Sequence, residues 1–391
     1  MGNGIRRVGV AERRARLAVR HHLAPGAHAG TVTEAAADMA GLHGTDPASV
    51  FLAARARVAA AGPAAVEQAL YAERGLVRML GMRRTMFVVP AALAPVIQAA
   101  CTDEIAGRMR RRLARQVQEC GIAPDGDGWL KEVGQATVRA LAARGTATGA
   151  ELARDEPRLR AQLSYAASKS YGGPVNLTNR VLTVLSAEGL IVRGRPRGGW
   201  TSGQFTWSPA AAQVAPPAAA ARTELARRWL LAFGPALRSD LQWWTGWTAG
   251  QVTRALAQLE VADVDLDGST GVMLAADEPA PAAVAPWPAL LPALDPTPMG
   301  WRTRAWYVGE HGPALFDRSG NIGPTVWWNG RIIGGWAQRP DGEIAVRLLE
   351  DAGAEASAAV AAEAARLREW IGNVRLTPRF RTPLERELAG G

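Results

Sequence analysis

A short polar segment of the chain carries the side chains best suited to chemistry. His43, Thr45 and Asp46 lie within GLHGTDP, residues 41–47. A histidine can orient or deprotonate a water molecule, a threonine hydroxyl can hold that water, and a carboxylate can stabilise a nearby positive charge. A structural role fits the same residues, because threonine and aspartate are common helix caps and His43 suits a polar turn. Composition alone favours the structural role.

No established catalytic motif accompanies this segment. The chain contains no GxSxG, no HExxH, no P-loop and no GxGxxG followed by a suitable acid. The other histidines and the two cysteines, Cys101 and Cys120, lack metal-ligand spacing. Any chemistry is therefore expected to proceed without a metal or a cofactor.

The charge balance favours a polyanionic partner. The 391 residues include 45 Lys+Arg and 36 Asp+Glu, a formal charge of +9, and nearly all of the basic residues are arginines. Arginine binds phosphates and guanine edges in a bidentate manner, although biased codon usage accounts for an arginine excess equally well. Two cysteines, no signal segment and no long apolar run predict a cytoplasmic protein without a membrane span.

Three stretches repeat one order of elements, which is helix, short capped helix, amphipathic helix and β-hairpin. In the middle copy, a helix over 129–141 precedes a short helix capped by Thr148, and an amphipathic helix ends at Gly189. Strands are expected at 190–193 and 204–207. This order is the winged-helix pattern.

The first and third copies carry weaker versions of the pattern. In the first, Thr33 is expected to cap a short helix, and Asp46 followed by proline marks the start of the next one. Its hairpin, LVRML and TMFVVP, would turn near Gly81. The third copy begins near Thr223, and Thr248 is expected to cap its last helix, before VADVDLDG opens the hairpin.

The remaining chain is expected to be rich in strands. ALLPALDP, RAWYVG, TVWWNGRIIGGWAQ and EIAVRLLE are predicted as strands, with Asn329-Gly330 as a hairpin turn, before a last helix over 355–371. The predicted fold class is therefore α+β, with three tandem winged helices and a C-terminal β-rich region. The predicted boundaries are 1–95 for the first winged helix, 96–127 for a connecting helical segment, 128–209 for the second winged helix, 210–221 for an Ala/Pro-rich linker, 222–276 for the third and 277–391 for the C-terminal region.

The middle copy offers candidate contacts to double-stranded DNA. The flexible, glycine-rich wing suits a loop that follows a phosphate strand, and the start of the preceding helix is polar, although both also fit a solvated turn. A basic helix over 108–116 either lies along DNA or faces solvent. The wing candidates are Arg193, Arg195 and Arg197, the helix candidates are Asn176, Thr178, Asn179 and Arg180, and the basic helix presents Arg108, Arg111, Arg112 and Arg115 on one face.

Several segments, taken in order, resemble the AlkZ-type winged-helix proteins, a family of bacterial DNA glycosylases. The resemblance covers most of the chain. It is carried by GLHGTDPASVFLAARAR (41–57), MRRTMFVVP (82–90), GLIVRGRPRGGW (189–200), FGPALRSDLQWWTG (233–246), LLPALDPTPMGWRTR (290–304) and VWWNGRIIGGW (326–336).

The resemblance implies hydrolysis of the N-glycosidic bond of alkylated purines, especially N7-alkylguanine, including interstrand crosslinks left by natural products. In that family the motif reads like GLQAQDP, so His43 and Thr45 replace the two residues that position the hydrolytic water. It also implies that the Asn329-Gly330-Arg331 hairpin tip reaches into DNA, and it adds Arg83 and Arg84 as DNA contacts. With no lysine in the motif, a monofunctional enzyme is expected.

Two other functions fit the same sequence. A catalytically silent winged-helix protein, either a transcription regulator or a lesion binder, is consistent with the missing glutamine pair. A scaffold built from degenerate winged helices predicts no salt-dependent binding to DNA. A monomer is expected, since the tandem units supply several contacts within one chain.

Overall fold

The described residues form both helices and strands, which confirms the predicted α+β class. The computed structural model describes residues 5–59, 61–164, 174–378 and 380–390. Within these residues, no helix has both the length and the apolar character needed to cross a membrane.

The first unit places the polar motif between two helices and beside a hairpin. Asp46 caps the helix after the motif and Pro47 is its first residue, as predicted. Thr33 is not the cap of α2, which corrects the prediction. The side chain of Thr31 accepts the hydrogen bond from the Glu34 amide, because Thr31 has the extended backbone of a residue that directly precedes a helix. The unit comprises α1 (Val10–Arg20), α2 (Val32–Asp38), β2 (Leu42–His43), α3 (Pro47–Arg55), α4 (Pro63–Glu67), β3 (Leu76–Leu80) and β4 (Met86–Pro90), with sheet order β2-β4-β3.

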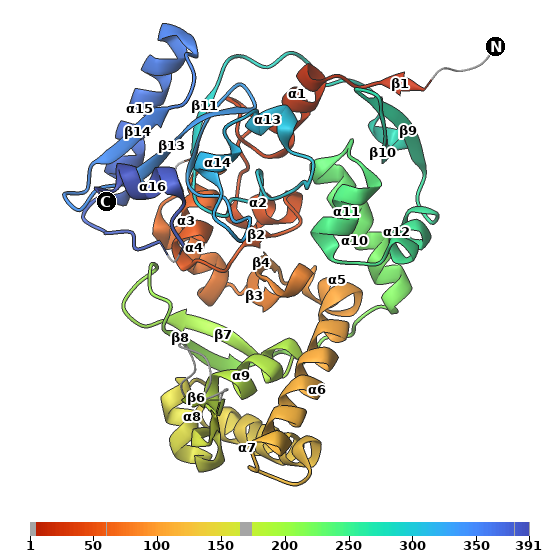
Figure 1. The fold of residues 1–391 in the computed structure, drawn as a ribbon, viewed down its shortest axis with the longest axis vertical. Helices are drawn as coiled ribbons and strands as arrows, with labels where there is room; N and C mark the ends of the chain where they lie inside the picture. The colour runs from red at the N-terminus through yellow and green to blue at the C-terminus, as the bar shows by residue number, and fades with distance from the viewer. Residues whose placement is uncertain (1–4, 60, 165–173, 379, 391) are drawn as a thin grey trace.

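The middle unit has a hydrophobic core of its own and lies at the lower end of the molecule in Figure 1. A capping box starts its short helix, where Thr148 and Glu151 each bond the other's backbone amide. Two helices, α5 (Ala94–Ile97) and α6 (Asp103–Glu119), connect it to the first unit. It comprises α7 (Gly126–Arg144), α8 (Gly149–Asp155), β5 (Gln162–Ser164), β6 (Pro174–Asn176), α9 (Leu177–Ala187), β7 (Ile191–Pro196) and β8 (Phe205–Pro209).

The third unit shares its sheet with the beginning of the chain. Strand β1 (Arg6–Arg7) pairs in parallel with β9, so this N-terminal segment lies in the sheet of the third unit. Thr248 forms the predicted cap together with Gln251. The unit comprises α10 (Ala218–Phe233), α11 (Arg238–Thr245), α12 (Ala249–Leu256), β9 (Val261–Leu266) and β10 (Ser269–Leu274).

The C-terminal region forms a four-stranded antiparallel sheet with helices beside it (Figure 1). RAWYVG is not a strand, which corrects the prediction: it forms α13 (Ala305–Val308), a short helix ended by Gly309. A four-residue apolar run does not distinguish strand from helix, and here Tyr307 donates to the Pro298 carbonyl from within the core. The other elements are β11 (Pro288–Leu291), α14 (Gly312–Leu315), β12 (Thr325–Trp328), β13 (Arg331–Gln338), β14 (Ile344–Leu348), α15 (Gly353–Ile371) and α16 (Pro383–Leu388).

Candidate active site and a basic cleft

The side chain of His43 is buried and neutral. β2 pairs with β4 so that His43 lies opposite Phe87, with the two ring centroids 5.5 Å apart. Burial, reinforced by the positive charge of Arg83, lowers the pKa of His43 to about 3. Among the described residues, none offers a hydrogen-bond partner to its Nδ1. The neutral imidazole is suited to orienting a water molecule, whereas so low a pKa makes it a poor proton acceptor.

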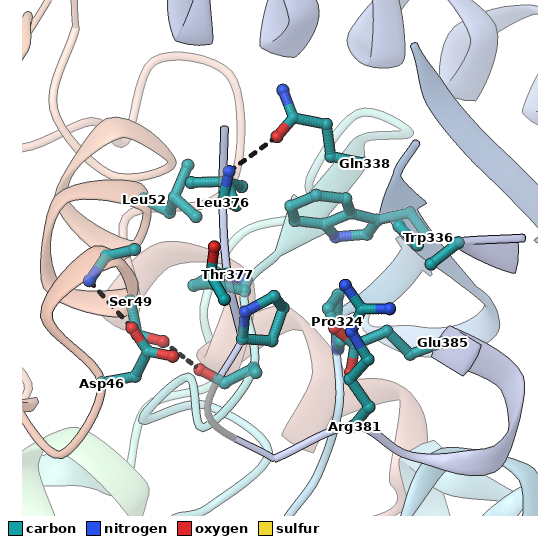
Figure 2. A pocket seen from close by; sticks show the side chains of 16 residues that line it. Asp46, Ser49, Leu52, Pro324, Trp336, Gln338, Leu376, Thr377, Arg381 and Glu385 are labelled. Carbon is teal, nitrogen blue, oxygen red and sulfur yellow. Dashed lines mark hydrogen bonds between the residues drawn. The ribbon is translucent and has the colours of Figure 1, made fainter. Parts of the chain in front are cut away.

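Asp46 serves as the helix cap and faces a different neighbourhood from His43. Its Oδ1 accepts a hydrogen bond from the Ala48 amide at 2.9 Å. Asp46 also lines a cavity of about 30 Å³ between α3, β13 and α16, which Figure 2 shows from close by. Most of the surface that lines this cavity is apolar. Thr45, between these two residues, is half-buried.

Glu385 projects from α16 into the same small cavity (Figure 2). Burial raises the pKa of its carboxyl to about 7, against the opposing effect of the Thr382 backbone amide. The negative charge of Asp46 contributes to the same rise. A carboxyl with such a pKa exchanges its proton near neutral pH.

Gly44, at the centre of the motif, is held from behind by a buried arginine. The Gly44 amide donates to the Met86 carbonyl at 2.7 Å, and the Gly44 carbonyl accepts from Nη1 of Arg78. Burial lowers the pKa of Arg78 to about 10. A Cβ atom on Gly44 would lie 3.2 Å from that Nη1 and 3.2 Å from the backbone carbon of Phe87, so a side chain here would require these neighbours to shift.

Arg83 lies on the other side of the motif, in the turn between β3 and β4. Both Arg83 and Arg84 have positive φ values, 53° and 62°, which is a costly backbone conformation for arginine. The Arg83 guanidinium lies 3.9 Å from the ring centroid of Trp243. Burial, followed by the charge of Arg304, lowers the pKa of Arg83 to about 10.

Arg83 and Arg84 also line a basic cleft of about 380 Å³. Arg108 and Arg112 project into this cleft from α6, and the turn between α11 and α12 closes it. Its acidic residue, Glu104, is engaged in an ion pair with Arg222 at 2.5 Å. Four guanidinium groups around one cleft favour an anionic ligand such as a phosphate. The full lining is Arg83, Arg84, Cys101, Glu104, Ile105, Arg108, Met109, Arg112, Thr245, Gly246 and Trp247.

The four residues at the start of α9 that were predicted to contact DNA divide into two groups. Asn176 caps α9 by accepting from the Thr178 amide at 3.0 Å, and the buried Thr178 hydroxyl donates to the Leu159 carbonyl. Asn179 is exposed, and the half-buried Arg180 donates to the Gln116 side chain at 3.3 Å. Asn179 and Arg180 therefore retain side-chain surface for DNA, while Asn176 and Thr178 stabilise the helix start.

The three wing arginines all have partners inside the protein. Arg195 forms an ion pair with Glu67 of the first unit at 2.6 Å, and Arg197 forms one with Glu151 at 3.1 Å. Arg193 lies over the rings of Phe205 and Trp207. Contacts from Arg195 and Arg197 to DNA would require phosphates to replace these carboxylates.

The hairpin tip at Asn329 and Gly330 packs against the N-terminal helix. A Cβ atom on Gly330 would lie 2.7 Å from that of Arg14 in α1. The Asn329 side chain accepts from the Trp287 amide at 2.8 Å, and Arg331 forms an ion pair with Glu350. These contacts place the tip within the fold in this structure.

The sequence analysis missed Arg78 as a site residue. The only signal was its position as a lone cation inside the apolar strand LVRML, where a buried charge requires a partner. The cleft was also not anticipated, because its two pairs of arginines come from separate elements. Among the described residues, no group of three His, Cys, Asp or Glu side chains gathers to hold a metal.

Tandem helix–hairpin units together with a cleft lined by four arginines define an α+β protein with a surface suited to an anionic ligand. A family model described as DNA glycosylase AlkZ-like matches residues 36–370, and the chain therefore belongs to this DNA glycosylase family. The Streptomyces sahachiroi DNA glycosylase AlkZ has a similar structure, with a TM-score of 0.73 and 20% sequence identity over 93% of this chain and 97% of that chain. No curated protein matches the sequence.

Proposed function

We propose that this DNA glycosylase hydrolyses the bond between deoxyribose and an alkylated purine, with N7-alkylguanine as the preferred lesion class, including bulky adducts and interstrand crosslinks. The observation that carries the proposal is the position of Arg83. It lines the basic cleft and also acts on His43 electrostatically. A duplex whose backbone occupies the cleft therefore brings a deoxyribose close to the motif.

The chemistry requires little basicity from the enzyme. N7-alkylguanine carries a positive charge, so it leaves with the electrons of the C1′–N9 bond as a neutral base. Water then adds to the oxocarbenium-like C1′ and releases a proton to the solvent. His43 orients that water through its neutral imidazole, and Thr45 holds it through its hydroxyl. Asp46 contributes negative charge towards the sugar while it caps α3.

DNA phosphates would also act on the pKa of His43. A phosphate near Arg83 offsets the positive charge that helps to lower the pKa of His43. The products are the free alkylated base and an abasic site. Lys131 lies on α7 of the middle unit, and Lys169 is outside the described residues, so the motif has no lysine for strand cleavage through a Schiff base.

The proposed DNA contacts centre on the cleft, with Arg83 and Arg84 as predicted and with Arg108 and Arg112 from α6. A backbone that leaves the cleft along α6 continues towards the middle unit (Figure 1). The other side chains predicted to contact DNA remain proposals. Asn179 and Arg180 of α9 have side-chain surface available for such a contact. DNA contacts from the remaining candidates would require their present contacts within the protein to be exchanged; these candidates are Asn176, Thr178, Arg193, Arg195, Arg197, Asn329 and Arg331.

A duplex with one N7-methylguanine tests the proposal. Incubation followed by heating in alkali should cut the strand at the lesion, and His43→Ala should abolish the cut while leaving DNA affinity nearly unchanged. Loss of binding together with loss of cleavage would point instead to a folding defect.

A catalytically silent lesion binder is the second candidate. The observation that favours it is the burial of His43, with a pKa of about 3. It predicts tight binding to alkylated duplex of any sequence without base release, also from a crosslinked duplex. A preference for one undamaged sequence would favour a transcription regulator.

A further inference from the structure

We propose that Arg78 is a positioning residue that couples the wing of the middle unit to the active-site motif. The inference rests on the proposed function, since the motif is assigned there as the hydrolytic site. It concerns how that site is held in its active geometry. The coupling runs from Phe205 in the wing, through the guanidinium of Arg78, to the carbonyl of Gly44.

The motif end of this connection is fixed by contact on two sides. Nη1 of Arg78 donates to the Gly44 carbonyl, and the Gly44 amide donates to the Met86 carbonyl of β4. Gly44 lies between His43 and Thr45, so a rotation of its peptide groups reorients both proposed water-binding side chains. Small shifts of this kind have large effects on rate, because the reacting atoms must be aligned.

The wing end of the connection comes from a different unit. The Arg78 guanidinium carbon lies 4.7 Å from the ring centroid of Phe205, the first residue of β8. In Figure 1, β7 lies beside β3, which carries Arg78, and β8 pairs with β7. The aromatic face stabilises a buried cation that has few other partners.

Arg78 depends on this aromatic contact because its remaining polar atoms are poorly satisfied. It is only 2% exposed, and its Nε and Nη2 form no hydrogen bond of good geometry with the described residues. The Tyr71 hydroxyl lies close enough to raise the pKa of Arg78, against the larger lowering caused by burial. Movement of the wing therefore changes the surroundings of Arg78 directly.

The wing is also anchored at its tip. Trp200 is buried between Phe51 of α3 and Trp370 of α15, with ring centroids 5.1 Å and 5.7 Å away. The same helix α3 begins with the Asp46 cap. DNA binding that shifts the middle unit would thus be transmitted to the centre of the motif through Arg78 and to its C-terminal end through α3.

Single-turnover base release and hydrogen–deuterium exchange test the coupling together. Phe205→Ala should lower the rate constant at saturating enzyme by about 10-fold, and Arg78→Met by about 100-fold, with the dissociation constant for lesion duplex within about twofold of wild type. Arg78→Lys, which keeps a donor for Gly44, should recover part of the loss. Gln204→Ala, at an exposed neighbouring position in the wing, is the matched control and should leave the rate constant unchanged.

The double variant Phe205→Ala/Arg78→Met should be no slower than Arg78→Met alone, since both substitutions interrupt the same connection between the wing and the motif. Amide exchange in a peptide covering residues 42–47 should accelerate in Phe205→Ala and not in Gln204→Ala. This readout is independent of catalysis. Failure of wild-type base release would therefore overturn the proposed function, whereas an unchanged exchange rate in Phe205→Ala, or additive effects in the double variant, would overturn the coupling.

Discussion

Arginine side chains are buried in several places, and two of these places differ in how well the charges are matched. In the first, both amino groups of Arg57 bind the Asp295 carboxylate, at 2.8 Å and 2.6 Å, and Thr297 accepts a further bond at 2.7 Å. In the second, around the motif, the buried Arg78 and the half-buried Arg83 form no ion pair within the described residues. Within the same residues, Nε is without a hydrogen-bond partner in all three arginines, and Arg78 also leaves Nη2 without one.

This difference separates a structural site from a functional one. The Arg57–Asp295 pair is fully buried and joins α3 to the segment after β11, and His21 from α1 extends it by contacting Thr297 at 2.9 Å. Its charges are neutralised inside the protein. The positive charge around the motif has no such partner in the described part of the chain, and this lack lowers the stability of the folded protein. Proteins retain unpaired charges of this kind where an anionic ligand supplies the missing negative charge.

The largest expected effect is the loss of the matched pair. Asp295→Ala should lower the free energy of unfolding by about 3–5 kcal/mol, because it leaves the Arg57 charge buried and uncompensated. Urea denaturation measures this loss. Glu343→Ala breaks an exposed ion pair with Arg368 and should cost at most about 1 kcal/mol. Equal losses of unfolding free energy in the two variants would show that the buried ion pair is no more important for stability than an exposed one.

The next effect concerns catalysis at the unmatched site. His43→Ala should slow base release by at least about 100-fold, because no other group of the motif replaces its contact to water. Its melting temperature should fall only modestly, since the substitution removes packing against Phe87 but no hydrogen bond to Nδ1 among the described residues. Base release at the wild-type rate would contradict the assignment. His43→Gln restores the residue type of the family motif and should retain more activity than alanine.

Glu385 is an acidic group that is buried and forms no ion pair among the described residues, so it tests the cost of an unmatched charge of the opposite sign. Its pKa in the folded protein, about 7, is above the ordinary value of 4.5. The stabilisation from its proton is therefore complete below pH 4.5 and is lost as the pH rises through 7. Glu385→Gln should remove this slope and should be more stable than wild type at pH 8 by at most about 3 kcal/mol. Parallel pH profiles of the melting temperatures would contradict the buried, protonated carboxyl.

The smallest effects are expected at the exposed rim of the cleft. Arg84→Ala and Arg112→Ala should each weaken DNA binding to damaged and undamaged duplex alike, and each should reduce the slope of log affinity against log salt by about 1. Fluorescence anisotropy at several salt concentrations measures this slope. Arg139→Ala, on α7 away from the cleft lining, is the control. Unchanged slopes in both cleft variants would contradict the proposal that DNA phosphates bind in the cleft.

Much of the fold was predictable because its signals are local. The caps at Asp46, Thr148 and Thr248 depend on hydrogen bonds between residues two or three positions apart, and the structure has all three. Where local signals compete, the prediction failed: Thr31 rather than Thr33 caps α2, and α13 replaces a predicted strand.

The candidate site was predictable only in part. His43, Thr45 and Asp46 stand out in the sequence, and family membership supports a glycosylase. The sequence did not indicate that Asp46 and His43 face different neighbours, or that Arg78 lies behind Gly44. Those relations depend on how strands and helices from separate units pack.

The sequence by itself therefore determined the order of the elements, the α+β class, the basic character and the motif, since each depends on composition or on short-range spacing. The tertiary structure alone decided which charges are matched. Arg57 meets Asp295 across 238 positions of the chain, and the wing meets the motif across a boundary between units. Such pairings arise when hydrophobic surfaces bury together, and the burial then sets the pKa and the availability of every polar group it encloses.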